Sequence, residues 1–179
     1  MPDLRYLVDF DLNFLKEVLR LLDAKLTELS KEADQIEDPD MSGHYERMEY
    51  IIGFGFVACQ QYLTAVMGTR EKKRGLSLGP IHRLGDPVAT IVNAAANYWK
   101  HSPDWDSPAG KKAQNQREET RKPLLRLGVN LQGSYPLSNV LAELLSPPTA
   151  CFEELLPLLV AWRDAWLRER SSAEARHGT

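Results

Sequence analysis

The residues best suited to chemistry stand at the end of one predicted helix, in the stretch Asn97-Tyr-Trp-Lys-His101. Asn97 and His101 are four residues apart, so their side chains lie one helical turn from each other on the same face. Asn93 extends this ridge by another turn, and Lys100 stands beside it. An imidazole can move a proton at a phosphodiester while an ammonium stabilises the developing negative charge. The candidate catalytic residues are His101, Asn97 and Lys100, with Asn93 as a candidate substrate-binding residue.

A purely structural role accounts for the same residues. Lys100 and His101 occupy the last predicted turn, where cations interact favourably with the helix dipole. Asn97 can hydrogen-bond to a neighbouring helix, and Tyr98 and Trp99 suit a core and its boundary. No second histidine or carboxylate shares the ridge, so neither a metal nor another cofactor is expected there.

The helix that positions these residues is predicted from Asp86 to about His101. Asp86 can accept backbone N–H bonds as an N-cap, and Pro87 suits the first helical position. Pro103 disfavours helical geometry at the residue before it, which ends the helix. At about 100° per residue, one side is apolar and carries Val88, Ile91, Val92, Ala95, Tyr98 and Trp99. The opposite side carries Thr90, Asn93, Asn97, Lys100 and His101. We therefore expect Trp99 to be largely buried and Asn93 to face solvent or a ligand.

The charge of the chain is unevenly distributed around this helix. The net charge is −3, but residues 68–122 hold 11 Lys/Arg against six Asp/Glu. A basic middle in an acidic protein suits a phosphate or an acidic partner. A solvated polar loop region explains it equally well. The candidate substrate-binding cations are Lys72, Lys73, Arg74 and Arg83.

The segment AANYWKH, which ends at His101, resembles the motif region of the HEPN superfamily. Many members of that superfamily are all-α, metal-independent ribonucleases of toxin–antitoxin, CRISPR and phage-defence systems. Their motif runs from Arg through a polar residue, often Asn, to a His a few residues later. The resemblance carries the polar position onto Asn97 and the histidine onto His101, whereas the position of the motif Arg falls on Ala96. It therefore implies an RNA-binding protein, either an active ribonuclease or a degenerate domain that does not cleave.

Two long helices are predicted at the start of the chain, at about 4–34 and 41–67. The first has apolar residues at alternating steps of four and three, typical of a helix packed along one face. This stripe comprises Val8, Leu12, Leu15, Leu19, Leu22, Leu26 and Leu29. It is widened by Leu7, Phe10, Phe14, Val18 and Leu21, so we expect more than one neighbour for the helix. Packing within the chain and dimerisation both fit the stripe.

The second predicted helix contains Gly53 and Gly55 in its apolar stripe. Each glycine costs about 1 kcal/mol relative to Ala inside a helix, so close approach of another helix is expected there. The letters from Gly53 to Ala58 also match the GxGxx(G/A) dinucleotide fingerprint, which functions only between a strand and a helix. Period-two alternation is lacking around it, and this interpretation is rejected.

Glycine and proline divide the rest of the chain. Long polar loops are expected at 68–85 and 102–116. Residues 111–122 are highly charged without an apolar stripe, which leaves an exposed helix and a linker both open. A short helix capped by Thr120 is expected to end at Gly128.

The last part of the chain is predicted to contain two helices. The first spans Pro136–Leu145. Thr149 is expected to cap the second, which Pro157 should kink or divide because proline removes a backbone hydrogen bond. The polar residues 171–179 are expected to fray.

The whole chain indicates one all-α domain over residues 1–179. The expected architecture is a helical bundle of two long antiparallel helices, a central motif helix, a C-terminal helix and short accessory helices. No apolar run approaches the roughly 18 residues of a membrane span, and no cationic leader precedes the first apolar stretch. Cys59 and Cys151 are expected to be buried free thiols, in keeping with a cytoplasmic protein.

Two functional hypotheses remain open. The first is a HEPN-like protein that binds RNA through the polar face of the Asp86 helix and the basic loops. The second is a non-enzymatic interaction module, a subunit or neutralising partner that binds another protein or a second copy of itself.

Overall fold

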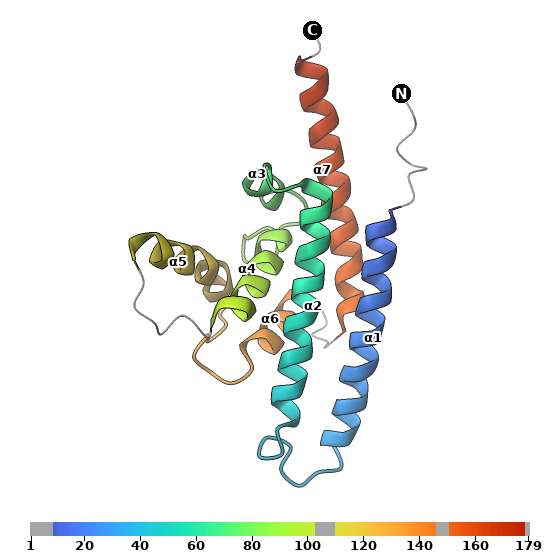
Figure 1. Cartoon of the computed structure of the whole chain (residues 1–179), viewed down its shortest axis with the longest axis vertical. Coiled ribbons are helices and arrows are strands. Elements are labelled where there is room, and N and C mark those ends of the chain that lie inside the picture. The colour runs from blue at the N-terminus through green and yellow to red at the C-terminus, as the bar shows by residue number, and fades with distance from the viewer. Residues whose placement is uncertain (1–8, 103–109, 146–150, 178–179) are drawn as a thin grey trace.

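The computed structural model describes residues 9–102, 110–145 and 151–177, and within them every regular element is a helix. The all-α prediction is confirmed. Three long helices dominate: α1 (Phe10–Ala33), α2 (His44–Met67) and α7 (Leu156–His177). Figure 1 shows α1 and α2 running antiparallel with α7 alongside, while the shorter helices lie on the other side of α2. These are α3 (Lys72–Leu76), α4 (Val88–His101), α5 (Lys111–Arg126) and α6 (Pro136–Leu144).

Helix α2 is the centre of the bundle. It contacts α1, α4, α6 and α7, which explains why so much of it is apolar. It is the one helix in the described part of the chain that is long and apolar enough to cross a membrane. Half of its most apolar window is buried inside the protein, as expected for a core helix.

The leucine stripe of α1 packs as its spacing predicts. Leu12, Leu15, Leu19, Leu26 and Leu29 are buried, and α1 contacts both α2 and the 3-10 helix η3 (Phe152–Leu155). Val8 of the stripe and Leu7, expected to widen it, lie outside the described residues. The residues expected to widen the stripe behave differently, because Phe10, Phe14 and Leu21 are exposed. The heptad face is therefore used inside the chain, and a second apolar face of α1 is left at the surface.

Both glycines of α2 mark close approaches, as predicted. A Cβ atom at Gly53 would stand 2.1 Å from the indole of Trp99 on α4. One at Gly55 would stand 2.3 Å from the ring of Phe152 in η3. Such distances are far inside van der Waals contact, so only glycine lets these aromatic rings lie against the α2 backbone. The absence of a strand here also agrees with the rejection of the dinucleotide fingerprint.

The start of α4 corrects one prediction. Asp86 does not cap the helix: Pro87 is the N-cap residue and no side chain caps it. The Asp86 carboxylate instead accepts two bonds of 2.6 Å from the guanidinium of Arg126. The first free N–H, that of Val88, donates to the carbonyl of Pro80 at 2.9 Å. The carboxylate therefore joins α4 to the end of α5 by a bidentate ion pair.

The second half of the chain is more helical than predicted. α3 interrupts the expected loop at 68–85, and α5 begins at Lys111, inside the loop expected at 102–116. α5 then continues through Pro123 to Arg126, so the separate short helix capped by Thr120 is not formed. Burial of Leu124 and Leu127 against the core outweighs the backbone bond that Pro123 removes. The helix ends before Gly128, which has a φ of +81°, as predicted.

The C-terminal part divides where proline predicts it. η3 ends at Leu155 and α7 begins at Leu156, with Pro157 in its first turn, where the missing N–H has no helical partner to lose. α6 matches the helix predicted at Pro136–Leu145 to within one residue. The predicted cap Thr149 lies outside the described residues. α7 runs on to His177, through most of the segment expected to fray.

Candidate functional site

A buried amide on α2 organises the polar face of α4. Gln60 is 7% exposed. Its Nε2 donates to Asn93 Oδ1 at 2.8 Å and to Asn97 Oδ1 at 2.9 Å. Its Oε1 accepts a bond of 2.6 Å from Lys100 Nζ. The carboxamide oxygens of Asn93 and Asn97 therefore face α2. Asn93 is half-buried, so α2 covers part of the polar face that was expected to meet solvent or a ligand.

Among the described residues, the ammonium of Lys100 has no anionic partner in this cluster. Its hydrogen-bond partner is the neutral amide of Gln60. Partial burial lowers the pKa of Lys100, and the neighbouring Lys72 ammonium lowers it further. Both effects disfavour the charged form, so an anion placed nearby would relieve them.

A cavity of about 250 Å³ opens beside this cluster, between α4 and α5. α3 contributes one cation to it, α4 contributes the motif residues, and α5 forms the opposite wall. The lining residues are Lys72, Asn97, His101, Ala113, Gln116, Arg117 and Thr120. Among these described residues, three are basic or can become cationic, several others can hydrogen-bond, and none is acidic. The cavity is therefore suited to an anion that also offers hydrogen-bonding groups.

The motif residues divide their contacts between the cluster and the cavity. Asn97 does both: its Oδ1 accepts from Gln60 and its side chain lines the cavity. His101 is exposed at the end of α4, where its imidazole reaches the cavity wall. Ala96 is completely buried, so the position that the HEPN resemblance gives to an arginine points into the core. An arginine is nevertheless among the residues that line the cavity, namely Arg117 of α5.

The predicted basic residues do not form one surface. Lys72 lines the cavity, but its neighbours Lys73 and Arg74 border a separate depression with Arg70 and Glu71. Arg74 donates to Glu169 at 2.5 Å. Arg83 forms an ion pair with Glu143 on α6. The structure thus brings Lys72 to the motif residues and places Lys73, Arg74 and Arg83 elsewhere.

The two aromatic residues of the motif have different roles. Tyr98 donates its hydroxyl to the carbonyl of Leu131 at 2.9 Å, which holds α4 to the loop before α6. Trp99 lies over Gly53 and contacts the rings of Tyr50 and Phe54. It is half-buried, less than predicted, because these ring contacts lie at the edge of the core.

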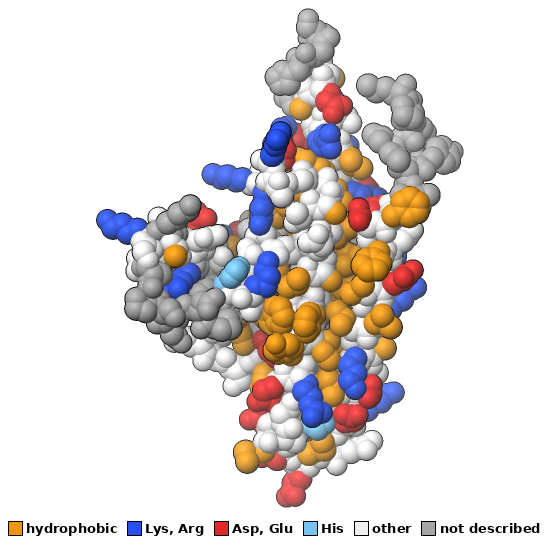
Figure 2. All heavy atoms as spheres, in the orientation of Figure 1, with side chains coloured by type: hydrophobic (Ala, Val, Ile, Leu, Met, Phe, Trp, Pro, Cys, Tyr) orange, Lys and Arg blue, Asp and Glu red, His pale blue; other side chains and the backbone are white. Residues whose placement is uncertain are grey.

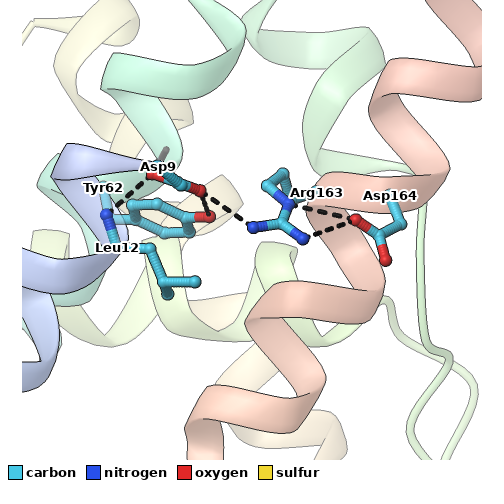
Figure 3. Close-up of polar contacts among 5 residues, drawn as sticks. All are labelled: Asp9, Leu12, Tyr62, Arg163 and Asp164. Carbon is cyan, nitrogen blue, oxygen red and sulfur yellow. Dashed lines mark hydrogen bonds and ion pairs between the residues drawn. The ribbon is translucent and has the colours of Figure 1, made fainter. Parts of the chain in front are cut away.

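A second polar cluster joins α1, α2 and α7 (Figure 3). Asp9 accepts bonds from the Leu12 N–H, Tyr62 and Arg163, at 2.8, 2.9 and 3.0 Å. Arg163 also donates to Asp164 at 2.8 Å. Burial alone would raise the pKa of Asp9, but these hydrogen bonds and the Arg163 charge lower it overall. The cluster caps α1, and each of its charged groups has an oppositely charged partner within it.

The two cysteines are free thiols, as predicted. Cys59 is buried, and desolvation raises the pKa of its thiol to about 12. Cys151 is half-buried, and its Sγ donates to the Asp23 carboxylate at 3.3 Å. Neither thiol has a depressed pKa, so neither is suited to nucleophilic chemistry.

Sequence reasoning missed four residues of the site. Arg117, Gln116 and Thr120 belong to a segment without an apolar stripe, which gave no sign of the wall they form. Gln60 could have been found, because it is a polar residue beside Cys59 and Leu63 on an apolar helix. Within the described residues, no group of three or more His, Cys, Asp or Glu side chains is arranged to hold a metal.

Comparisons of this chain with protein-family models, curated proteins and solved structures find no match.

Proposed function

We propose that this protein binds RNA in the cavity between α4 and α5, as a cytoplasmic, HEPN-like helical protein of a bacterial defence or toxin–antitoxin type system. The observation that carries the proposal is the composition of the cavity wall, where Lys72, His101 and Arg117 meet and none of the described lining residues is acidic. The unbalanced ammonium of Lys100 beside them adds to the positive field. A phosphate backbone supplies the matching charge.

Cleavage of the RNA is the finer form of the proposal, and it depends on His101. The imidazole is exposed at the cavity, where it can accept or donate a proton at a bound phosphodiester without a metal. Arg117 supports this role because it adds an arginine to the cavity lining, whereas the position of the motif arginine is occupied by Ala96. A chain that binds RNA without cleaving it corresponds to the degenerate form of the same domain.

The experiment is fluorescence anisotropy of a labelled RNA hexanucleotide, titrated at several salt concentrations. We expect Lys72→Glu to weaken binding at least tenfold and to flatten the dependence on salt, because fewer counterions are released. Lys73→Glu is the matched control, since it makes the same charge change on the same helix but away from the cavity. His101→Ala should retain most of the binding and abolish any cleavage.

Two results would contradict the proposal. One is no RNA binding at about 50 mM salt by a correctly folded sample. The other is an equal loss of affinity in Lys72→Glu and Lys73→Glu, because that would locate the effect in general charge and not in the cavity.

A second candidate function is a protein interaction through α1. Phe10, Phe14 and Leu21 recur at steps of four and seven, so they share one face, and all three are exposed. Figure 2 shows orange side chains gathered along this side of the molecule. Contiguous exposed apolar surface is typical of interfaces, here with a second copy or a neutralising partner. Sedimentation of the wild type and of Phe14→Glu tests the self-association form: a dimer that Phe14→Glu dissolves supports it.

A further inference from the structure

Three aromatic rings form an exposed cluster next to the cationic cavity. Tyr50 and Phe54 are one turn apart on α2, and Trp99 of α4 packs against both. The three ring centroids are separated by 4.8 to 5.6 Å. Tyr50 is 60% exposed and Phe54 is 48% exposed. Neither ring is needed to fill the core, so their exposure calls for an explanation by function.

The position of the rings follows from the helices that carry them. Gly53 lets Trp99 lie directly on the α2 backbone, which fixes the cluster between the two helices. Lys100 and His101 follow Trp99 on α4, and Lys100 reaches Gln60 on α2. Gln60 is six residues beyond Phe54, a rise of about 9 Å along the helix. Figure 2 shows basic and histidine side chains directly beside the orange group over α2.

We infer that the aromatic cluster Tyr50, Phe54 and Trp99 stacks the unpaired bases of a single-stranded RNA whose phosphates enter the cavity lined by Lys72, His101 and Arg117. This inference rests on the proposed function and names the class of RNA. Aromatic side chains beside a positively charged groove are how single-stranded nucleic acids are bound without base-specific contacts. In a duplex the bases stack on each other and offer no free face.

The adjoining charge distinguishes this occupant from a protein. An apolar partner helix would need the rings alone and would gain nothing from the uncompensated ammonium beside them. RNA uses both features at once, a ring face for each base and a cation for each phosphate. Lys100 and His101 directly follow Trp99 on α4, so one helix carries a ring of the cluster and the cations next to it.

The test compares two probes of equal charge: a hexauridylate, and a hexamer of the same length in which every nucleotide is abasic. We expect the wild type to bind the hexauridylate at least tenfold more tightly than the abasic hexamer. The double variant Tyr50→Leu/Phe54→Leu removes the two exposed rings but keeps apolar side chains. It should lose most of the preference for the hexauridylate, since only Trp99 of the cluster remains, and should keep the salt dependence of the wild type. Phe14→Leu on α1 is the matched control, a ring of similar exposure far from the cavity, and should behave as the wild type.

Each other outcome has a definite meaning. Equal binding of the two probes by the wild type overturns the stacking inference and leaves phosphate binding in place. So does tight binding of a blunt RNA duplex, or an equal loss for both probes in the double variant. Failure of both probes to bind at low salt overturns the proposed function itself. Self-association of the wild type that the double variant abolishes would identify the rings as a protein interface and overturn the inference.

Discussion

Gln60 and Tyr62 lie two residues apart on α2, face opposite sides of it, and belong to polar clusters of opposite kinds. Tyr62 joins Asp9 and Arg163, where one guanidinium lies between the carboxylates of Asp9 and Asp164. Gln60 joins Lys100, where the partner of the ammonium among the described residues is an uncharged amide. In the first cluster every charged group has an oppositely charged partner, whereas in the second the ammonium has none among the described residues. The closed cluster of Asp9, Tyr62 and Arg163 holds helices together. The open cluster of Gln60 and Lys100 has a cavity beside it and is able to receive a ligand.

The largest expected effect is on the closed cluster. Arg163→Met should lower the free energy of unfolding by about 2–3 kcal/mol, because removal of one partner leaves the partly buried Asp9 carboxylate without its cation. Urea denaturation measures this. Lys25→Met is the control, since the Lys25–Glu28 pair is exposed and should contribute less than about 1 kcal/mol. Equal small effects would mean that the closed cluster does not hold α1 to α7.

The next effect depends on pH. Hydrogen bonds and the Arg163 charge lower the pKa of Asp9 in the folded protein, so the ionised carboxylate stabilises the fold above the unfolded pKa of about 3.9. At pH 7 the wild type should exceed Asp9→Asn by about 1.5 kcal/mol. This difference should shrink as the pH falls through the lowered pKa. A difference that stays constant between pH 7 and pH 2 would contradict the role of the charge.

The contrast between the clusters also shows what the sequence could predict. The stripe of α1, the extent of α4 and the close approaches at Gly53 and Gly55 follow from local spacing, because helical periodicity and the lack of a Cβ act over a few residues. The spacing of Asn97 and His101 likewise indicated a polar ridge on one helix.

What the sequence did not predict depends on contacts between distant segments. Asp86 has the chemistry of a cap, but its partner Arg126 is 40 residues away. The α5 segment has no stripe of its own, so its role as the cavity wall is decided by packing of Leu124 and Leu127 on α4 and the core. Lys73 and Lys72 are neighbours in sequence and still border different depressions. Helix propensity and counts of charged residues do not indicate which distant residues will come into contact.

The third effect concerns ligand binding by the open cluster. Lys100→Met should weaken binding of an RNA hexanucleotide about tenfold, because it removes one cation next to the cavity. The same substitution should lower the free energy of unfolding by about 1 kcal/mol, less than Arg163→Met, since the buried Gln60 Oε1 loses its donor but no carboxylate loses its cation. Anisotropy and urea denaturation on the same samples separate the two. A loss of stability as large as that of Arg163→Met would show that the two clusters are alike.

The smallest effect is the pH dependence of Lys100 itself. Partial burial and the Lys72 charge lower the pKa of Lys100 in the folded protein below the ordinary 10.5. At pH values between the folded and the unfolded pKa, the unfolded chain therefore binds more protons than the folded one. The stability of the wild type relative to Lys100→Met should therefore rise with pH through that window, by less than about 1 kcal/mol. The fold disfavours the charged form of Lys100, whereas it favours the charged form of Asp9. The comparison with Lys100→Met cancels the titration of tyrosines common to both proteins.

A phosphate-rich ligand in the cavity should raise the pKa of Lys100 again, because an anion favours the charged ammonium. Titration of the Lys100 side-chain resonance by NMR, with and without a hexauridylate, measures the shift, and a pKa that does not move on binding would place the RNA away from this cluster.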